Sequence, residues 1–327
     1  MILEEKDLSS IITGAVRTWE ENGEIHFSRF TEKQTALYTQ KNGGELLKKT
    51  FATASMTLDF ITDADKLSFD WFMREASSRR FYHFDFFVDG VMTDHFDAEK
   101  KTACARGHAE FSIPEGKHHI TLYLPNLMMT TLYNVELHGA TMLEPVKKAR
   151  KFYFVGDSIT QGYDAIYPSM SYVNRVARVM NAEVLNQAIG SEIFDEHILD
   201  ADLPYAPELV VIAYGTNDFI KCENHEQFIG NAEAFFLRAR EVFPEAQIAY
   251  ISPIWRGETE KDNSPVGEFF TLAKELGALA EACGLFHIDG QKLVPHLSAF
   301  YSDLTLHPND MGFSFYAENF VRAICEF

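Results

Sequence analysis

The sequence predicts two domains of different fold class: an all-β sandwich or jelly roll over residues 1–145, followed by an α/β domain over residues 146–327. Two observations predict this division. Short aromatic-rich runs separated by turn residues fill the first part, as in antiparallel sandwiches. Longer apolar runs alternate with amphipathic helical patterns in the second part, as in a three-layer domain whose parallel sheet is covered on both faces.

The expected strands of the first domain lie in short alternating or aromatic-rich runs. These runs are GAVRTWEENGEIHFSRF, TASMTLDFIT, DKLSFDWFM, RRFYHFDFFVDG, HAEFSIPEGKHHITLYLP and TLYNVELHGA. Turn signals separate them at Asn22-Gly23, Asn42-Gly43-Gly44, Asp89-Gly90 and Pro114-Glu115-Gly116. One short helix is expected over residues 31–40. We interpret the phenylalanine-rich run at 81–91 as part of the sandwich core.

The second domain is expected to alternate strands and helices. The strands are predicted at 151–155, 183–187, 208–214, 247–252 and 285–289. The helices are predicted at 168–180, 195–201, 225–243, 264–284 and 309–327. Right-handed crossovers then give a three-layer, flavodoxin-like parallel sheet. The junction between the domains is placed in MLEPVKKARK, which contains Pro145 and four basic residues.

Composition points to a globular protein whose main partners are neither nucleic acids nor anionic membranes. Of the 327 residues, 46% are hydrophobic and 24% are charged, and the formal net charge is −19. Such an acidic chain repels a phosphate backbone or anionic lipid headgroups. No apolar run reaches the ~18 residues of a membrane-spanning helix, and the first residues do not resemble a secretion signal. The four cysteines are scattered, so the expected compartment is a reducing cytoplasm.

Polar residues follow the ends of the expected strands of the second domain, where a parallel sheet binds its ligands. Ser158 comes shortly after the first strand, and Gly190 lies just beyond the second. Asn217 follows the third strand, and His307 follows the fifth. A hydroxyl, an imidazole, a glycine N–H and a carboxamide are the groups that acyl transfer requires. The sequence therefore predicts a nucleophilic site at this edge of the sheet.

Four short blocks carry a resemblance to a known family. GDSIT, NQAIG, GTND and HPND occur in this order over about residues 150–327. In this the chain resembles the SGNH hydrolases, the GDSL-type esterase superfamily. The resemblance implies that Ser158 is the nucleophile and His307 its general base. It also implies an oxyanion hole made by the backbone N–H groups of Ser158 and Gly190 and by the carboxamide of Asn217. No cofactor is implied, and no metal is expected because the histidines form no HxH or HExxH arrangement.

The chain departs from the family pattern beside the histidine. The family places the aspartate of its triad three residues before the histidine, where this chain has Leu304. Asp303 lies four residues before His307, and one helical turn would bring the two side chains onto the same face. We therefore expect Asp303 to hold Nδ1 of His307. The alternative is a Ser–His dyad whose imidazole is oriented by a backbone carbonyl.

Several residues near these blocks have two interpretations. Gly190 serves either the oxyanion or only a turn of the chain, and Asn217 serves either the oxyanion or the cap of the next helix. Asp157 is expected to order its loop by accepting backbone N–H groups, and Asp310 to cap the last helix. Three further residues either line the acyl or alcohol pocket or serve only in packing: Tyr163, Asp164 and Trp255.

These features predict a serine esterase that works through an acyl-serine intermediate. A β-sandwich joined to such a domain is similar to the arrangement in some carbohydrate esterases, which implies a small acyl ester, above all an acetyl ester of a carbohydrate or glycoside. One alternative is an acyltransferase with the same residues, and another is a non-catalytic carbohydrate-binding protein. The expected partner is a small-molecule or saccharide ester, with no nucleic acid and no membrane; a homo-oligomer is compatible with the sequence.

Overall fold

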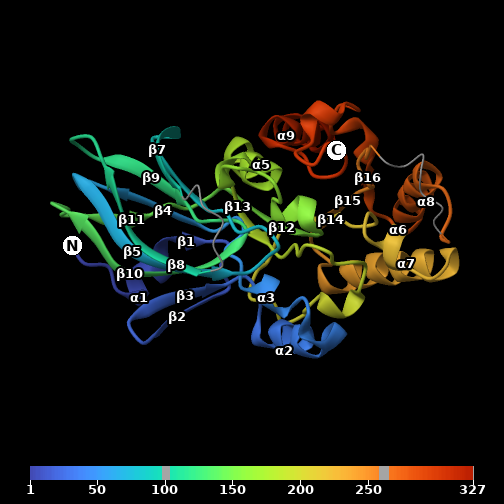
Figure 1. Cartoon of the computed structure of the whole chain (residues 1–327), viewed down its shortest axis with the longest axis horizontal. Coiled ribbons are helices and arrows are strands. Elements are labelled where there is room, and N and C mark those ends of the chain that lie inside the picture. The colour runs from blue at the N-terminus through green and yellow to red at the C-terminus, as the bar shows by residue number, and fades with distance from the viewer. Residues whose placement is uncertain (98–103, 258–264, 327) are drawn as a thin grey trace. The chain divides into compact units, whose positions relative to one another are not determined.

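The structure, a computed structural model, describes residues 1–97, 104–257 and 265–326 (Figure 1). It divides into two compact units. The first comprises Met1–Ala149 and Ile166–Ser169, and the second comprises Arg150–Ala165 and Met170–Phe327. The chain thus passes into the second unit a few residues after the predicted boundary between 145 and 146.

Two antiparallel sheets form the body of the first unit. The first sheet has the order β1-β4-β9-β6-β7, with β11 also paired to β4; its strands are β1 (Ile12–Thr13), β4 (Thr57–Thr62), β6 (His83–Val88), β7 (Val91–Asp97), β9 (His118–Tyr123) and β11 (Leu143–Pro145). The second sheet has the order β2-β3-β10-β5-β8; its strands are β2 (Arg17–Glu21), β3 (Glu24–Ser28), β5 (Lys66–Glu75), β8 (Cys104–Ser112) and β10 (Met128–His138).

Side chains from both sheets form one apolar core, so the first unit is a sandwich. Phe69 of β5 lies edge-on to Phe84 of β6, with ring centroids 5.2 Å apart. Phe86 of β6 stacks on Phe111 of β8 at 4.6 Å. The phenylalanine-rich run is therefore part of the core, as predicted.

Three helices accompany the sandwich in the described residues. The sequence predicted α2 (Glu32–Gln40), whose cap Thr31 accepts the N–H of Gln34 in a capping box. It missed α1 (Glu5–Ile11), which is short and buries only Leu8 and Ile11, and α3 (Leu47–Thr50). A helix this short forms through tertiary packing, and its own sequence pattern is too brief to reveal it.

A short segment that follows the first strand of the α/β domain belongs to the first unit. The N–H of Ser169 donates to the buried carboxylate of Asp85 at 2.8 Å. The side chain of Asn126 donates to the carbonyl of Pro168 at 3.3 Å, and the Tyr167 ring packs against His83 at 5.2 Å. These contacts explain why Ile166–Ser169 groups with residues that precede it by more than forty positions.

The second unit is built on a parallel sheet with the order β13-β12-β14-β15-β16. Its strands are β12 (Arg150–Gly156), β13 (Ala182–Asn186), β14 (Leu209–Ala213), β15 (Gln247–Ile251) and β16 (Phe286–Ile288). This order places the second strand outside the first and the third on the other side, which is the flavodoxin-like arrangement. The predicted fold class is therefore confirmed. The carboxyl ends of β13, β12 and β14 are neighbours at one edge of the sheet.

Helices cover both faces of this sheet (Figure 1). The helices are α4 (Ser158–Gln161), α5 (Tyr172–Met180), α6 (Asp218–Lys221), α7 (His225–Val242), α8 (Phe269–Ala282) and α9 (Asp310–Cys325). On one face, Tyr172 of α5 stacks on Tyr316 of α9 with ring centroids 4.0 Å apart, and Phe154 of β12 packs beneath them. On the other face, Phe236 of α7 packs on Tyr250 of β15 at 4.8 Å. Successive strand residues point to opposite faces, which is why each strand is apolar throughout.

Three helix predictions were too long. The run at 168–180 divides into a 3-10 turn over Pro168–Met170 and the helix α5, which begins at Tyr172. The run at 195–201 forms only a single 3-10 turn over Glu196–Ile198. The helix predicted over 264–284 begins at Phe269, where the carboxylate of Glu268 accepts the N–H groups of Phe270 and Thr271; Ser264 lies outside the described residues. Across the three described ranges, no helix is long and apolar enough to cross a membrane.

Candidate active site

Ser158 is the first residue of α4 and lies two residues beyond the end of β12. The carboxylate of Asp157 caps this short helix by accepting the N–H of Ile159 at 2.9 Å. Asp157 therefore orders the loop, as the sequence predicted. Burial raises the pKa of Asp157 to about 6, although the Ile159 N–H and the nearby His307 favour its charged form. The cap holds the Ser158 side chain at the sheet edge, where 8% of the residue is exposed.

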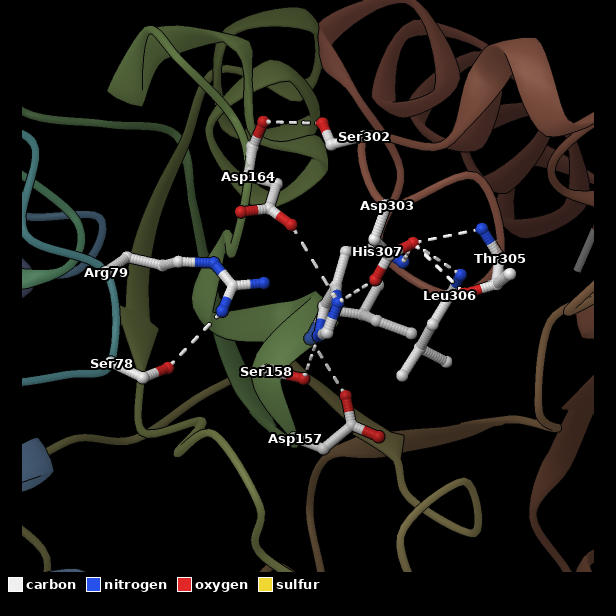
Figure 2. Close-up of polar contacts among 11 residues, drawn as sticks. Ser78, Arg79, Asp157, Ser158, Asp164, Ser302, Asp303, Thr305, Leu306 and His307 are labelled. Atoms are coloured by element: carbon white, nitrogen blue, oxygen red, sulfur yellow. Dashed lines mark hydrogen bonds and ion pairs between the residues drawn. The ribbon is translucent and has the colours of Figure 1, made fainter.

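The structure brings Ser158, His307 and Asp303 into one hydrogen-bonded chain (Figure 2). The Ser158 hydroxyl lies 2.8 Å from Nε2 of His307. On the other side of the ring, Nδ1 lies 2.7 Å from a carboxylate oxygen of Asp303. A carboxylate accepts hydrogen bonds only, so Nδ1 carries the proton and Nε2 is free to accept from Ser158. This arrangement has the geometry of a nucleophile, a general base and an orienting acid.

Asp303 reaches His307 through a loop, and the helical turn we expected there is absent. The Oδ1 atom of Asp303 accepts the backbone N–H groups of Thr305, Leu306 and His307 at 3.1, 2.7 and 3.1 Å, which wraps the loop around the carboxylate. Leu304, at the position of the extra residue, adopts a left-handed φ of +66° and is exposed. A carboxylate oxygen, and no backbone carbonyl, contacts Nδ1, which disfavours the dyad alternative.

The same contacts set the ionisation of Asp303. Burial alone would raise the pKa of this carboxyl, but hydrogen bonds from His307 and from the backbone N–H groups of the loop outweigh it. The pKa of Asp303 is therefore held well below its usual range. The group is therefore ionised at neutral pH.

The three pocket candidates occupy different places. Tyr163 stacks on the His307 ring, with centroids 5.6 Å apart and planes 26° from parallel. A carboxylate oxygen of Asp164 lies 3.8 Å from Nδ1 of His307, so the imidazole faces two acidic groups (Figure 2). Trp255 packs against Tyr301 at 5.1 Å and stacks on His296 at 5.7 Å. Tyr163 and Asp164 therefore both contact the imidazole of His307.

Gly190 is engaged differently from what the sequence predicted. Its backbone N–H donates to Oε1 of the buried Gln161 at 2.7 Å. The space that a Cβ would occupy is filled by Tyr163, whose hydroxyl oxygen would lie 2.5 Å from it. The absence of a side chain at Gly190 thus makes room for Tyr163, which stacks on His307. We had expected this space to be open to a substrate. The predicted oxyanion role of Gly190 remains a prediction, and its N–H is already bonded in this structure.

Gly190→Ala should destabilise the second unit and disturb the packing of Tyr163 on His307. The new methyl would overlap the Tyr163 ring, so we expect a loss of roughly 1–3 kcal/mol in the free energy of unfolding. Gly230→Ala is the matched control, because that glycine lies inside α7 with nothing within 4 Å of an added Cβ. It should gain about 0.5–1 kcal/mol. Urea unfolding of both variants measures this, and equal stabilities would contradict the packing argument.

Asn217 lies beside the loop that contains Gly190. Its Nδ2 donates to the carbonyl of Glu192 at 3.0 Å. Asn217 occupies the cap position of α6, but its side chain makes no capping hydrogen bond there, which disfavours the alternative interpretation. One hydrogen of the NH₂ group remains for a ligand.

The prediction that Asp310 caps α9 was wrong by one residue. Asp310 is the first residue of the helix, and Asn309 is the cap, whose side chain accepts the N–H of Gly312.

Asp218 joins two of the loops at this edge, and the sequence reasoning missed it. Its carboxyl oxygens accept the N–H of Phe194 at 2.8 Å and the N–H of Gly215 at 3.1 Å. Burial raises the pKa of Asp218 to about 7, against the effect of these hydrogen bonds. Unfolded aspartate titrates near pH 4, so the folded protein binds this proton more tightly than the unfolded chain. Stability should therefore fall as pH rises from about 4 to about 7.

Asp218→Asn should reduce this pH dependence. The amide has no proton to release, so the variant should escape a loss that amounts to about 1.4 kcal/mol per pH unit across the window. Urea unfolding at pH 4, 5.5 and 7 measures the slope. Asp202→Asn, at an exposed position, is the control and should keep the original profile. Parallel curves for Asp218→Asn and the unchanged protein would show that Asp218 is ionised when folded.

Two groups of side chains in the described residues have ligand atoms close enough to surround a metal ion: Asp164, Asp303 and His307, and Asp195, Glu196 and His197. In the first group, the Asp303 oxygens are already bonded to the loop N–H groups and to the imidazole. The second group consists of three consecutive residues, of which His197 is exposed. Neither group gives reason to assign a metal role.

Residues 154–314 match the model of the GDSL-like lipase/acylhydrolase family, and this range contains Ser158, Asn217, Asp303 and His307. This segment is a GDSL-like lipase/acylhydrolase domain. The resemblance of residues 150–327 to the SGNH hydrolases is thus confirmed for this domain. No curated protein matches the sequence.

Several solved structures share the fold over both units. A salicylyl-acyltransferase, SsfX3, from a tetracycline biosynthetic pathway has a TM-score of 0.79 and 21% identity, covering 96% of this chain and 94% of that one. A family two carbohydrate esterase from Cellvibrio japonicus has a TM-score of 0.66 and 18% identity, covering 98% and 96%. An acetyl xylan esterase, Est2A, from the rumen bacterium Butyrivibrio proteoclasticus has a TM-score of 0.64 and 14% identity, covering 100% and 98%. At these identities the likeness concerns the fold.

Proposed function

We propose that this protein hydrolyses small carboxylic esters through an acyl-enzyme intermediate on Ser158. The observation that carries the proposal is the hydrogen-bonded chain from Ser158 through His307 to Asp303. A serine hydroxyl is a weak nucleophile until a base accepts its proton. Here the base lies 2.8 Å away and is oriented by a carboxylate whose pKa is held low.

The reaction follows from these positions. Ser158 Oγ attacks the ester carbonyl while Nε2 of His307 takes its proton, and Asp303 stabilises the imidazolium that forms. The negative oxygen of the tetrahedral intermediate needs donors, and the remaining hydrogen of the Asn217 amide supplies one. The Ser158 N–H supplies another, since it has no hydrogen-bond partner within the ranges the structure describes. His307 then gives the proton to the leaving alkoxide, and a water molecule repeats the sequence to release the acid.

An acetylated saccharide is the substrate class we favour. Support comes from the family two carbohydrate esterase and the acetyl xylan esterase, whose structures cover 98% and 100% of this chain.

Acyl transfer to an alcohol other than water is the second candidate. The observation that favours it is the salicylyl-acyltransferase, which covers 96% of this chain at a TM-score of 0.79. The residues for both reactions are the same as far as the acyl-enzyme. The outcome depends on whether water or a bound alcohol reaches the acyl carbonyl first.

An acyl-length series tests the proposal. Aryl acetate, butyrate and octanoate should be turned over in decreasing order, followed by release of acetate from O-acetylated xylo-oligosaccharides. Preference for octanoate would overturn the acetyl assignment and leave the mechanism intact. A transfer product that exceeds free acid in the presence of a second alcohol would favour the acyltransferase. Absence of both turnover and fluorophosphonate labelling would leave only a binding protein.

A further inference from the structure

A tight turn follows β13 and contains Gly190. The N–H of Glu192 donates to the carbonyl of Ile189 at 3.0 Å, which defines a β-turn over residues 189–192. Its third residue, Ser191, has a φ of +71°, in the left-handed region that such turns usually give to glycine. Backbone held in this region costs free energy and is found preferentially at functional sites. The peptide that joins Gly190 to Ser191 is therefore a candidate for a functional role.

The N–H groups of this turn have different partners. The N–H of Ile189 donates to the carbonyl of Gly156, at the end of β12, at 2.9 Å. The N–H of Gly190 donates to Gln161, and that of Glu192 closes the turn. The N–H of Ser191 has no partner among the residues that the structure describes. A backbone donor without a protein partner is available to a ligand.

The carbonyl groups of the turn are held on the side of Asn217. Nζ of Lys221 donates to the carbonyl of Ser191 at 2.5 Å, and Asn217 donates to the carbonyl of Glu192 at 3.0 Å. The turn is thus fixed at one end to the strand that leads to Ser158 and at the other end to Asn217. The N–H of Ser191 therefore lies on a segment that is bonded to Gly156, two residues before Ser158, and to Asn217.

Gln161, the last residue of α4, fixes the orientation of the turn. Its side chain is fully buried, and an N–H can donate only to the oxygen of a carboxamide, so Oε1 must face Gly190. This bond occupies the Gly190 N–H and holds the following peptide in place. Sequence reasoning could not find this residue, because a glutamine inside the GDSITQG segment has no chemical signature of its own.

We propose that the second backbone donor of the oxyanion hole is the N–H of Ser191, and that Gln161 is a positioning residue that holds this donor by binding Gly190. The proposal rests on the ester-hydrolase function proposed above. It moves the role predicted for Gly190 one residue along the chain. Three observations support this proposal: Ser191 has a left-handed φ, the N–H of Gly190 is already bonded, and the N–H of Ser191 has no partner among the described residues.

Replacing single backbone amides by esters tests the proposal directly. Nonsense suppression with an α-hydroxy acid removes one N–H and leaves the side chain unchanged. The ester at position 191 should lower kcat for aryl acetate by about 10²- to 10³-fold with little change in KM, the usual cost of one oxyanion donor. Its thermal midpoint should change little, because the lost N–H has no internal partner. The ester at position 190 should lower the thermal midpoint and reduce kcat less.

The outcomes separate this proposal from the function on which it depends. An unmodified protein that neither hydrolyses aryl acetate nor reacts with a fluorophosphonate would overturn both. An active protein whose 191 ester keeps full kcat, while the 190 ester loses it, would return the role to Gly190 and overturn only the present proposal.

Gln161→Met supplies a side-chain test of the positioning role. The thioether has nearly the same length but does not replace the carboxamide acceptor for Gly190. We expect kcat to fall by about tenfold or more with KM unchanged. Gln161→Glu keeps an acceptor oxygen and should recover most of that loss below the pH at which the buried carboxyl ionises. Equal loss of kcat in both variants at low pH would show that Gln161 acts only through packing.

Discussion

Ser158→Ala should lower kcat for aryl acetate hydrolysis by on the order of 10⁶-fold, to a rate supported only by binding and the remaining oxyanion donors. The methyl group cannot form the acyl intermediate, and the base 2.8 Å away has no proton to accept. Because the side chain is small and its hydroxyl bonds to no described residue other than His307, the fold should persist. Steady-state assay, circular dichroism and intact mass after fluorophosphonate treatment together measure these effects.

Ser314→Ala is the control for that experiment. This serine lies in α9, where its hydroxyl donates to the carbonyl of Asp310, and it takes no part in the site. It should retain full kcat and one fluorophosphonate adduct. Substantial turnover by Ser158→Ala, or labelling of that variant to the same extent as the control, would exclude Ser158 as the nucleophile.

Asp303→Asn should lower kcat by about 10³- to 10⁴-fold while most of the loop survives. Asparagine keeps the oxygen that accepts the N–H groups of Thr305, Leu306 and His307. Its NH₂ group, however, replaces the oxygen that accepts from Nδ1, which favours the wrong tautomer of the imidazole. A loss in kcat with a nearly unchanged thermal midpoint is the expected signature.

Asp164→Asn distinguishes the two carboxylates that face His307. Its oxygen lies 3.8 Å from Nδ1, against 2.7 Å for Asp303, so this variant should lose far less kcat. The double variant should lose more than Asp303→Asn alone if Asp164 partly replaces the missing charge. If Asp303→Asn kept at least a tenth of the original kcat while Asp164→Asn did not, the orienting acid would be Asp164.

The acid side of the stability profile provides a further measure of Asp303. Its pKa is lower in the folded protein than in the unfolded chain, so its contribution to stability is complete above about pH 4 and is lost as pH falls below that value. The buried Asp157 and Asp218 have the opposite sign, because their pKa values are raised. Stability should therefore decline in both directions from a region near pH 4.

Hydrophobic patterns within the sequence were sufficient to predict the parallel strands of the second unit. The apolar run before Ser158 and the alternation that follows it predicted all five parallel strands, because a strand buried on both faces has to be apolar throughout. The position of Ser158, Asn217 and His307 after these strands predicted that they would meet, because parallel strands end at a common edge. Helix α1 was missed because its stability comes from tertiary packing.

The amino-acid sequence was enough to predict the two fold classes, the flavodoxin-like strand order and the Ser158–His307 pair, since these follow from periodicity and from side chains with distinct chemistry. How Asp303 reaches His307, and which N–H groups of the 189–192 turn are bonded, could be seen only in the folded protein. A hydrogen bond is fixed by distances of a fraction of an ångström between segments far apart in the chain. Such distances depend on how Tyr163 and Gln161 pack against the turn, and no local pattern records them.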